Sequence, residues 1–259
     1  MAVIKNDSDR DWQAWGKNNA YFGVLADPKF LDANLNDDSL REFFDSGERH
    51  VEHVYGVIRA SLQSDFHPDR VLDYGCGVGR LVIPFARRSG TVVGVDVSPA
   101  MLDKAQMNCD KYHATSARLV HVQELGSLTP GSFDLVHSFI VFQHIPFARG
   151  EVIFRKLISL LAEGGVGAVH FIYADSRSTL RRGIRGLRER VNLVHKLMNV
   201  VQGKPFSTPL MQMNSYSLDR IFDILIDNGC SSLHVELTNH GGFHGAMLYF
   251  EKHSGSAKL

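Results

Sequence analysis

The chain has 259 residues, of which 44% are apolar and 22% charged, and its 28 basic side chains balance its 28 acidic ones. These proportions are those of a folded globular chain, and they exclude a disordered tail, a collagen-like repeat and a small disulfide scaffold. The charge balance gives no general attraction to nucleic acid or to anionic membranes. No stretch predicts a signal peptide or a membrane span, so we expect a cytoplasmic protein.

The first 67 residues predict a helical segment that caps the rest of the fold. Residues 12–31 are rich in aromatic side chains without a clear period, which is typical of a lid over a ligand or of a packed core. Apolar residues spaced by three and four over 40–62 predict an amphipathic helix that ends before Pro68. The candidate N-terminal caps of this helix are Asp37, Asp38 and Ser39.

Between residues 68 and 173, short β-branched runs alternate with helical stretches. Such alternation predicts a parallel sheet covered by helices on both faces, which is a doubly wound α/β fold. The carboxyl ends of the strands then share one edge, where ligands bind. The expected strands are 70–73, 91–96, 118–122, 133–139 and 166–172, and the expected helices are 79–88, 99–112 and 148–161.

The alternation ends at Asp175, and residues 174–216 predict a helical insertion. Apolar residues at steps of four and three over 180–201 indicate one long helix. The same region carries seven cations: Arg177, Arg181, Arg182, Arg185, Arg188, Arg190 and Lys196. Two arrangements are open: the apolar stripe is buried with the arginines in solvent, or the basic face binds an anionic partner such as RNA. The stripe would also suit the seam of a homodimer.

The last part of the chain, 217–259, predicts a helix and a hairpin that complete the sheet. The helix covers 217–228 and ends at Gly229, a common C-terminal signal. Two strand-like runs, 232–238 and 246–252, are joined by a glycine- and histidine-rich turn at 239–245.

One motif carries most of the chemical information. The strand VLD ends in Asp73, and Gly75, Gly77 and Gly79 lead from it into a helix. Glycines let backbone amides approach a ligand where a Cβ atom would collide, and they allow positive φ. The next strand ends in Asp96, whose carboxylate can accept both hydroxyls of a ribose.

The motif departs from the dinucleotide fingerprint in two ways. That fingerprint requires a third glycine at position 80, where this chain has Arg80. Asp73 would also face an anionic pyrophosphate, whereas it would attract the α-amino group and the sulfonium of a methionine. The sequence therefore favours S-adenosyl-L-methionine over a nicotinamide dinucleotide.

Five segments in this order resemble the class I S-adenosyl-L-methionine-dependent methyltransferases. They are VLDYGCGVG (71–79), GVDVSPAMLDKA (94–105), VQELGSLTPGSFDLVHS (122–138), VFQHIP (141–146) and LLAEGGVGAVHF (160–171). The resemblance implies a Rossmann-like, mostly parallel seven-stranded sheet whose last strand is antiparallel. Its core is 68–173, with the 1–67 cap and the 174–216 insertion selecting the acceptor.

The resemblance also implies the residues that contact the methyl donor. They are Asp73, Gly75, Cys76, Gly77 and Gly79 at the methionine end, Asp96 and Val97 at the ribose, Met101, Glu124 and Leu125 at the adenine, and Ser138 beside them.

The implied reaction is an in-line transfer of the methyl group to a hydroxyl, or to an amine, of a small molecule or glycan. His144 is the candidate base, because it follows the fourth strand and its imidazole is neutral at pH 7. Candidate acceptor contacts are Tyr21, Tyr173, His240 and His244. We expect no metal, since two histidines without a third ligand do not form a site.

Three other functions compete with this interpretation. An RNA or protein methyltransferase would use the basic 177–196 segment, although the balanced charge of the chain disfavours nucleic acid. An NAD-type oxidoreductase would use the glycine loop differently, and a catalytically silent subunit would bind the donor without transferring its methyl group.

Overall fold

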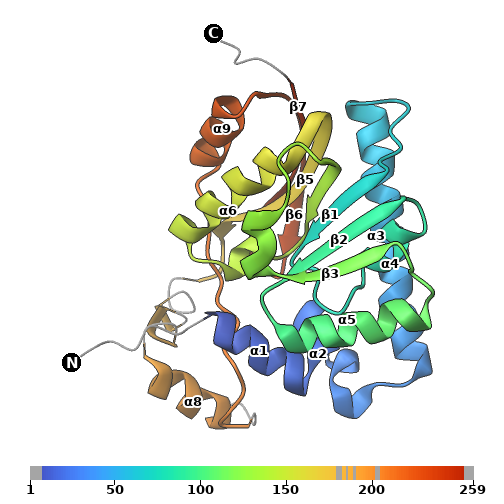
Figure 1. Ribbon diagram of the computed structural model, residues 1–259. Coiled ribbons are helices and arrows are strands. Elements are labelled where there is room, and N and C mark those ends of the chain that lie inside the picture. The colour runs from blue at the N-terminus through green and yellow to red at the C-terminus, as the bar shows by residue number, and fades with distance from the viewer. Residues whose placement is uncertain (1–7, 179–182, 185, 189–190, 202–204, 254–259) are drawn as a thin grey trace.

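Seven strands form a single sheet in the computed structural model, which describes residues 8–178, 183–184, 186–188, 191–201 and 205–253 (Figure 1). The strand order is β3-β2-β1-β4-β5-β7-β6. Strand β7 runs antiparallel to β5 and β6, and the other neighbours are parallel. The strands are β1 (Arg70–Tyr74), β2 (Thr91–Asp96), β3 (Ala117–His121), β4 (Phe133–Ser138), β5 (Leu161–Asp175), β6 (Cys230–His240) and β7 (Phe243–Lys252). The predicted doubly wound, mostly parallel sheet is confirmed.

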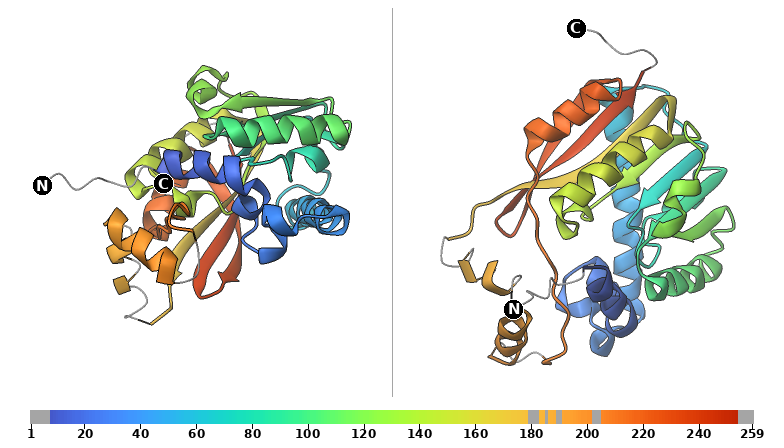
Figure 2. Two further views of the ribbon diagram at one scale, coloured as in Figure 1. Left: turned by 90° about the horizontal axis from the view of Figure 1, so that it is seen from below. Right: turned by 60° about the vertical axis from the view of Figure 1, so that its left-hand side comes forward.

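Helices cover both faces of this sheet, as the views in Figure 2 show. Successive side chains of a strand point to opposite faces, so each central strand contributes to two cores. In β1, Val71 belongs to the core under α3, α4 and α5, whereas Leu72 belongs to the core under α6 and α9. The α-helices are α1 (Ser8–Asn18), α2 (Ala20–Val24), α3 (Asp37–Ser61), α4 (Val82–Ala86), α5 (Pro99–Lys111), α6 (Phe147–Leu160), α8 (Asn192–Val201) and α9 (Leu218–Asp227). The short 3-10 helices are η1 (Pro28–Phe30), η2 (Asp32–Asn34), η3 (Val122–Ser127) and η4 (Phe142–His144).

The predicted N-terminal cap divides into two parts. Helices α1 and α2 lie across the carboxyl edge of the strands, whereas α3 packs along one face of the sheet (Figure 1). The predicted caps of α3 are corrected, because Asn36 is its N-cap. The Asn36 side chain accepts from the Ser39 amide at 2.9 Å, and the Ser39 hydroxyl accepts from the Asn36 amide at 2.9 Å, which forms a capping box.

The predicted single helix over 180–201 is wrong at Val191, which is not helical and separates the helical turns at 183–184 and 186–188 from α8. The predicted burial of the apolar stripe holds only in part. Val194 and Met198 are partly buried, but Leu187 is 52% and Val201 84% exposed, and the fully buried side chains here are the polar His195 and Asn199. Other predictions for this region lie outside the described residues: Leu180, Arg181, Arg182, Arg185, Glu189, Arg190, Gly203 and Lys204.

Hydrogen bonds between polar side chains explain why α8 buries His195 and Asn199. Arg188 donates from one guanidinium nitrogen to His195 Nδ1 at 3.1 Å and to the Asn199 side-chain oxygen at 3.2 Å. The carbonyl of Thr208 accepts from the Asn199 amide at 3.0 Å and lies 2.9 Å from His195 Nε2. A local network of side chains, which the periodicity of apolar residues does not reveal, therefore sets the buried face.

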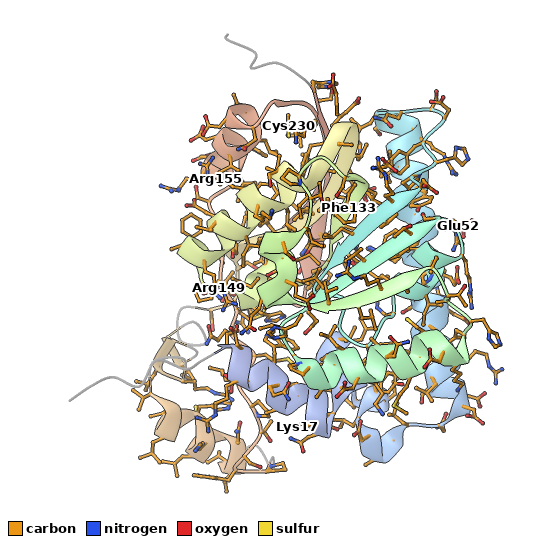
Figure 3. All side chains as sticks on the ribbon, in the orientation of Figure 1. Lys17, Glu52, Phe133, Arg149, Arg155 and Cys230 are labelled. Carbon is orange, nitrogen blue, oxygen red and sulfur yellow. The ribbon has the colours of Figure 1, made fainter. Side chains whose placement is uncertain are left out.

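The C-terminal hairpin is tighter than predicted. Strands β6 and β7 are joined by Gly241 and Gly242 alone, with φ of 63° and 92°, instead of by a loop over 239–245. Positive φ at both turn residues matches the twist of the two strands. Figure 3 shows Cys230 and Lys17 at opposite ends of the molecule. Cys230 begins β6, and Lys17 belongs to α1. In the described part of the chain, no helix combines the length and the apolar character needed to cross a membrane.

Candidate functional site

A cleft of about 710 Å³, including its open mouth, lies at the carboxyl edge of β1, β2 and β4. Strands β1, β2 and β3 follow one another toward one side of the sheet, and β4 and β5 toward the other. The cleft therefore lies where the strand order reverses, which is the position of ligand sites in open α/β sheets. Its volume is in the range of sites for small organic molecules.

The glycine loop after β1 forms one wall of the cleft. Gly75 and Gly77 have φ of 79° and 53°, conformations that side chains with a Cβ atom rarely adopt. The amides of Gly75 and Cys76 donate to the Val95 carbonyl at 2.7 and 3.0 Å, which ties the loop to β2. A Cβ atom at Gly77 would lie 2.5 Å from a methyl group of Val24 on α2. Close approach of a second segment thus requires glycine here.

Asp96 ends β2 at the floor of the cleft. Its carboxylate oxygens accept from the amides of Gly77 and Ser98, each at 2.9 Å. Burial raises the pKa of Asp96, and the hydrogen bonds from these amides and from the amide of Val97 oppose that rise. Each carboxylate oxygen can accept more than one hydrogen bond, so both can still receive a hydroxyl of a ligand.

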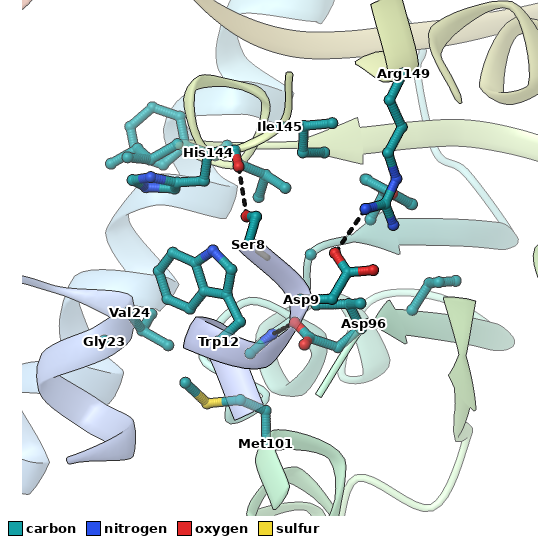
Figure 4. Close-up of a pocket in the computed structure, with 18 residues that line it drawn as sticks. Ser8, Asp9, Trp12, Gly23, Val24, Asp96, Met101, His144, Ile145 and Arg149 are labelled. Atoms are coloured by element: carbon teal, nitrogen blue, oxygen red, sulfur yellow. Dashed lines mark hydrogen bonds and ion pairs between the residues drawn. The ribbon is translucent and has the colours of Figure 1, made fainter. Parts of the chain in front are cut away.

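Helix α1 forms the roof of the cleft (Figure 4). The Ser8 hydroxyl donates to the His144 carbonyl at 2.8 Å, and Arg149 of α6 pairs with Asp9 at 2.6 Å. Trp12 meets the His144 ring edge-to-face, with 4.8 Å between ring centroids. Two polar contacts and one aromatic contact therefore hold α1 over the cleft and reduce its access to water.

The candidate base His144 lines the cleft, but it is a weakly basic imidazole. Its Nδ1 donates to the Gln212 carbonyl at 2.7 Å, which leaves the lone pair on Nε2. Burial lowers the pKa of His144 to about 4. No carboxylate contacts this ring in the described contacts, so a positive charge formed on it would be stabilised only by a peptide carbonyl.

Six of the residues predicted from the sequence line the cleft together: Gly75, Gly77, Asp96, Val97, Met101 and His144. Met101 is almost completely buried, because it lies where α5 packs against the N-terminal helices.

The other residues predicted to contact the donor lie outside the lining of this cleft, and their contact with the donor stays a prediction: Asp73, Cys76, Gly79, Glu124, Leu125 and Ser138. The buried Asp73 carboxylate lies 2.8 Å from His137 Nδ1, and the Ser138 hydroxyl donates to the Tyr74 carbonyl. Glu124 accepts from the His121 amide as part of the cap of η3.

The predicted acceptor contacts separate into two places. The Tyr21 hydroxyl is buried and donates to Asn108 at 3.0 Å, and its contact with an acceptor stays a prediction. Tyr173 and His244 have rings 6.3 Å apart where β5 meets the hairpin, and His240 lies 5.3 Å from His170. Among the described residues, no group of three or more side chains could hold a metal ion.

Sequence analysis missed the loop after β4 that forms the opposite wall: Phe139, Ile140 and Val141. Ile140 has φ of 61°, a strained conformation for a β-branched residue, and such strain concentrates at functional sites. No sequence signal predicts this conformation. The aromatic residues of 12–31 left a lid and a packed core open as alternatives, and the structure shows both, since Trp12 lines the cleft and Trp15 is buried in the core.

Comparisons with known proteins agree with this geometry. Residues 71–165 match a family model described as a methyltransferase domain. A ubiquinone biosynthesis O-methyltransferase from Xanthomonas euvesicatoria is 34% identical over 97 residues, which are 37% of this chain and 40% of that protein. One from Albidiferax ferrireducens is 30% identical over 145 residues, 54% of this chain and 56% of that protein. The similarity thus covers less than two thirds of the length of these relatives.

Solved structures extend the similarity of fold over more of the chain. A magnesium protoporphyrin IX methyltransferase from Synechocystis, determined with bound S-adenosylmethionine, superposes with a TM-score of 0.60 at 19% identity. The superposition covers 97% of this chain and 99% of that protein. A phosphoethanolamine N-methyltransferase from Haemonchus contortus has a TM-score of 0.54 at 17% identity, over 72% of this chain and 49% of that one. At these identities the likeness concerns the fold.

Proposed function

Since this chain belongs to the class I S-adenosyl-L-methionine-dependent methyltransferase superfamily, we propose that it transfers a methyl group from S-adenosyl-L-methionine to an oxygen of a small-molecule acceptor. The observation that carries this proposal is the Asp96 carboxylate at the tip of β2, beside a glycine loop with positive φ. When bound, the donor supplies a methyl carbon that its sulfonium activates toward a nucleophile.

The cleft residues suit the parts of the donor as follows. Asp96 accepts the ribose hydroxyls, and the loop of Gly75 and Gly77 leaves room for the methionine part. Met101 and Val97 provide apolar contact for the adenine. The roof of α1 excludes water, so the chain contributes mainly alignment and desolvation to the reaction.

A nicotinamide dinucleotide fits these residues less well. Position 80, where the dinucleotide fingerprint needs its third glycine, carries a buried arginine that donates to the Ser46 hydroxyl at 3.3 Å. The carbonyl of Arg80 packs against Gly47 of α3. Arg80 thus connects the glycine loop to α3. In the dinucleotide fingerprint, a glycine at this position lets the helix pack closely against the strand, and Arg80 leaves no room for that approach.

The arginine-rich segment gives RNA recognition little support. Arg177 forms two hydrogen bonds with the Asp175 carboxylate, both at 2.9 Å, and Arg188 is bound to the side chains of α8. Oxygen as the methylated atom is supported by the relatives that are named O-methyltransferases. An amine, a glycan and a protein remain the competing acceptors.

A transfer assay with S-adenosyl-L-methionine labelled in the methyl group tests the proposal. The acceptors are offered as separate pools of phenols, sugars, amines and RNA, with an Asp96→Ala variant as a control that should bind the donor more weakly. At limiting donor concentration, we expect label in a hydroxylated small molecule with the wild-type protein and much less label with the variant. Label found only in the RNA or amine pool would contradict the proposed acceptor, and absence of donor binding would contradict the function as a whole.

A further inference from the structure

A line of polar side chains runs through the sheet face under α3, next to the cleft. The Asp73 carboxylate of β1 lies 2.8 Å from Nδ1 of His137 on β4. Nε2 of His137 lies 3.0 Å from Nε2 of His50 on α3. Asp73 and His137 are buried, and burying such polar groups is costly unless each is hydrogen-bonded.

The hydrogen bonds determine which nitrogen of each ring carries a proton. A carboxylate only accepts, so His137 donates from Nδ1 and its Nε2 is an acceptor. His50 must then donate from its own Nε2, which leaves the lone pair of His50 on Nδ1. No described residue forms a hydrogen bond with His50 Nδ1.

His50 does not line the cleft itself, but its ring packs against Phe139, the residue that follows β4. The rings of His50 and Phe139 are 4.2 Å apart between centroids, and Phe139 also lines the cleft. Phe139 further contacts the rings of His170 and His240, at 5.2 and 6.2 Å. His50 is partly exposed, and His240 on β6 is exposed. Phe139 thus links the cleft wall to the partly exposed His50 and the exposed His240, over the buried ring of His170.

We propose that His50 is the general base of the methyl transfer, oriented by Asp73 and His137. This inference rests on the proposed function. The acceptor lies against Phe139, its O–H bond breaks as its oxygen bonds to the methyl carbon, and the proton passes to His50 Nδ1. The electron pair of the broken carbon–sulfur bond stays on the sulfur of the donor. His50 returns the proton to solvent after the product leaves.

The hydrogen-bond partners of His50, and not its basicity, distinguish it from His144. Burial, His137, Arg80, His53 and His170 lower the pKa of His50, just as burial lowers that of His144, so the lone pairs of both rings are available at pH 7. When Nδ1 takes a proton, the positive ring is stabilised through His137 by the Asp73 carboxylate. His144 has only the Gln212 carbonyl on its far nitrogen, and we assign it to the cleft wall.

The proposal is tested first without turnover, by nitrogen NMR of the protein labelled in its histidines and saturated with S-adenosylhomocysteine. His50 is expected to carry its proton on Nε2, and its Nδ1 resonance should move when the phenolic probe catechol is added. His50→Gln identifies the signal. The proposal would be overturned if His50 carried its proton on Nδ1, or if the Nδ1 resonance did not shift when the probe was added.

Transfer to catechol, whose hydroxyls are un-ionised at pH 7, gives the second measurement. Replacing His50 by Gln should lower kcat by about 100-fold to 10,000-fold and leave the dissociation constant of S-adenosylhomocysteine unchanged. His53→Gln, one turn along α3 and hydrogen-bonded to Glu236, is the matched control and should keep full activity. Unchanged kcat in His50→Gln would refute its role as base. If S-adenosylhomocysteine does not bind the wild-type protein, the proposed function fails with it.

Discussion

At the scale of single residues, Asp96 is the side chain on which donor binding depends most. Replacing it with Asn keeps an acceptor for the loop amides and removes the charge. Hydrogen bonds to a charged acceptor contribute about 1.5–3 kcal/mol, so the dissociation constant of S-adenosyl-L-methionine should rise about tenfold to 100-fold. Calorimetric titration measures this, with Asp227→Asn on the exposed side of α9 as a control that should bind normally.

Gly77 is required by its conformation and by its neighbour. Replacing Gly77 with Ala should destabilise the fold by about 1–2 kcal/mol, because a left-handed conformation is costly for a residue with a Cβ atom. The collision with Val24 adds to this cost. Urea unfolding measures the change.

Two further variants separate the two causes. The double variant Gly77→Ala, Val24→Ala removes the collision alone and should recover part of the loss. Gly126→Ala has open space around the new Cβ atom and no positive φ, so it should be nearly neutral. A Gly77→Ala protein as stable as the wild type would contradict the assigned strain.

The residues that sequence analysis placed correctly in the cleft are those whose backbone position determines their role. Gly75, Gly77 and Asp96 lie at strand ends, and the order of strands fixes the ends in space. Asp73 and Glu124 lie outside the lining of the cleft, and the contacts of their side chains depend on specific partners, His137 and the η3 cap. Such partners are distant in sequence or satisfy local backbone groups, and no periodic pattern reveals them.

At the scale of elements, α1 is the part of the molecule that closes the cleft. It carries both tryptophans of the chain, Trp12 and Trp15. Trp12 lines the cleft, whereas Trp15 is buried against Phe22. Donor binding should therefore change the tryptophan fluorescence. Trp12→Phe should abolish most of this change and Trp15→Phe should preserve it; the reverse result would place the roof elsewhere.

Helix α8 shows why the insertion could not be predicted in detail. The stripe of apolar residues matched the period of a helix, but the period does not state which face is buried. Hydrogen bonds among Arg188, His195 and Asn199 decide that face, and Val191 and Val201 of the predicted stripe remain exposed. The elements of the sheet were predictable because β-branched runs and their alternation with helices allow few topologies.

At the scale of the whole molecule, buried neutral histidines make stability depend on pH. Burial lowers the pKa of His144 to about 4 and that of His170 to about 3, whereas an unfolded histidine has a pKa of about 6.5. The unfolded chain therefore binds protons first as the pH falls. Stability should be full above pH 6.5 and should decrease as the pH falls toward the folded-state values.

The expected size of this effect is about 1.4 kcal/mol per pH unit for each histidine. Urea unfolding between pH 6 and pH 5 should thus show a loss of about 2–3 kcal/mol from these two side chains. His170→Gln should reduce the slope, and His67→Gln, which changes an exposed side chain, should preserve it. A flat profile would show that these rings are not held neutral by burial.

The account as a whole depends on which nucleotide the cleft under α1 binds. Isothermal titration calorimetry of the wild-type protein with S-adenosylhomocysteine, and separately with NADH, measures this directly. We predict saturable heat for one molecule of S-adenosylhomocysteine per chain, weakened in Asp96→Asn, and no heat with NADH. Saturable binding of NADH together with no response to S-adenosylhomocysteine would contradict the account.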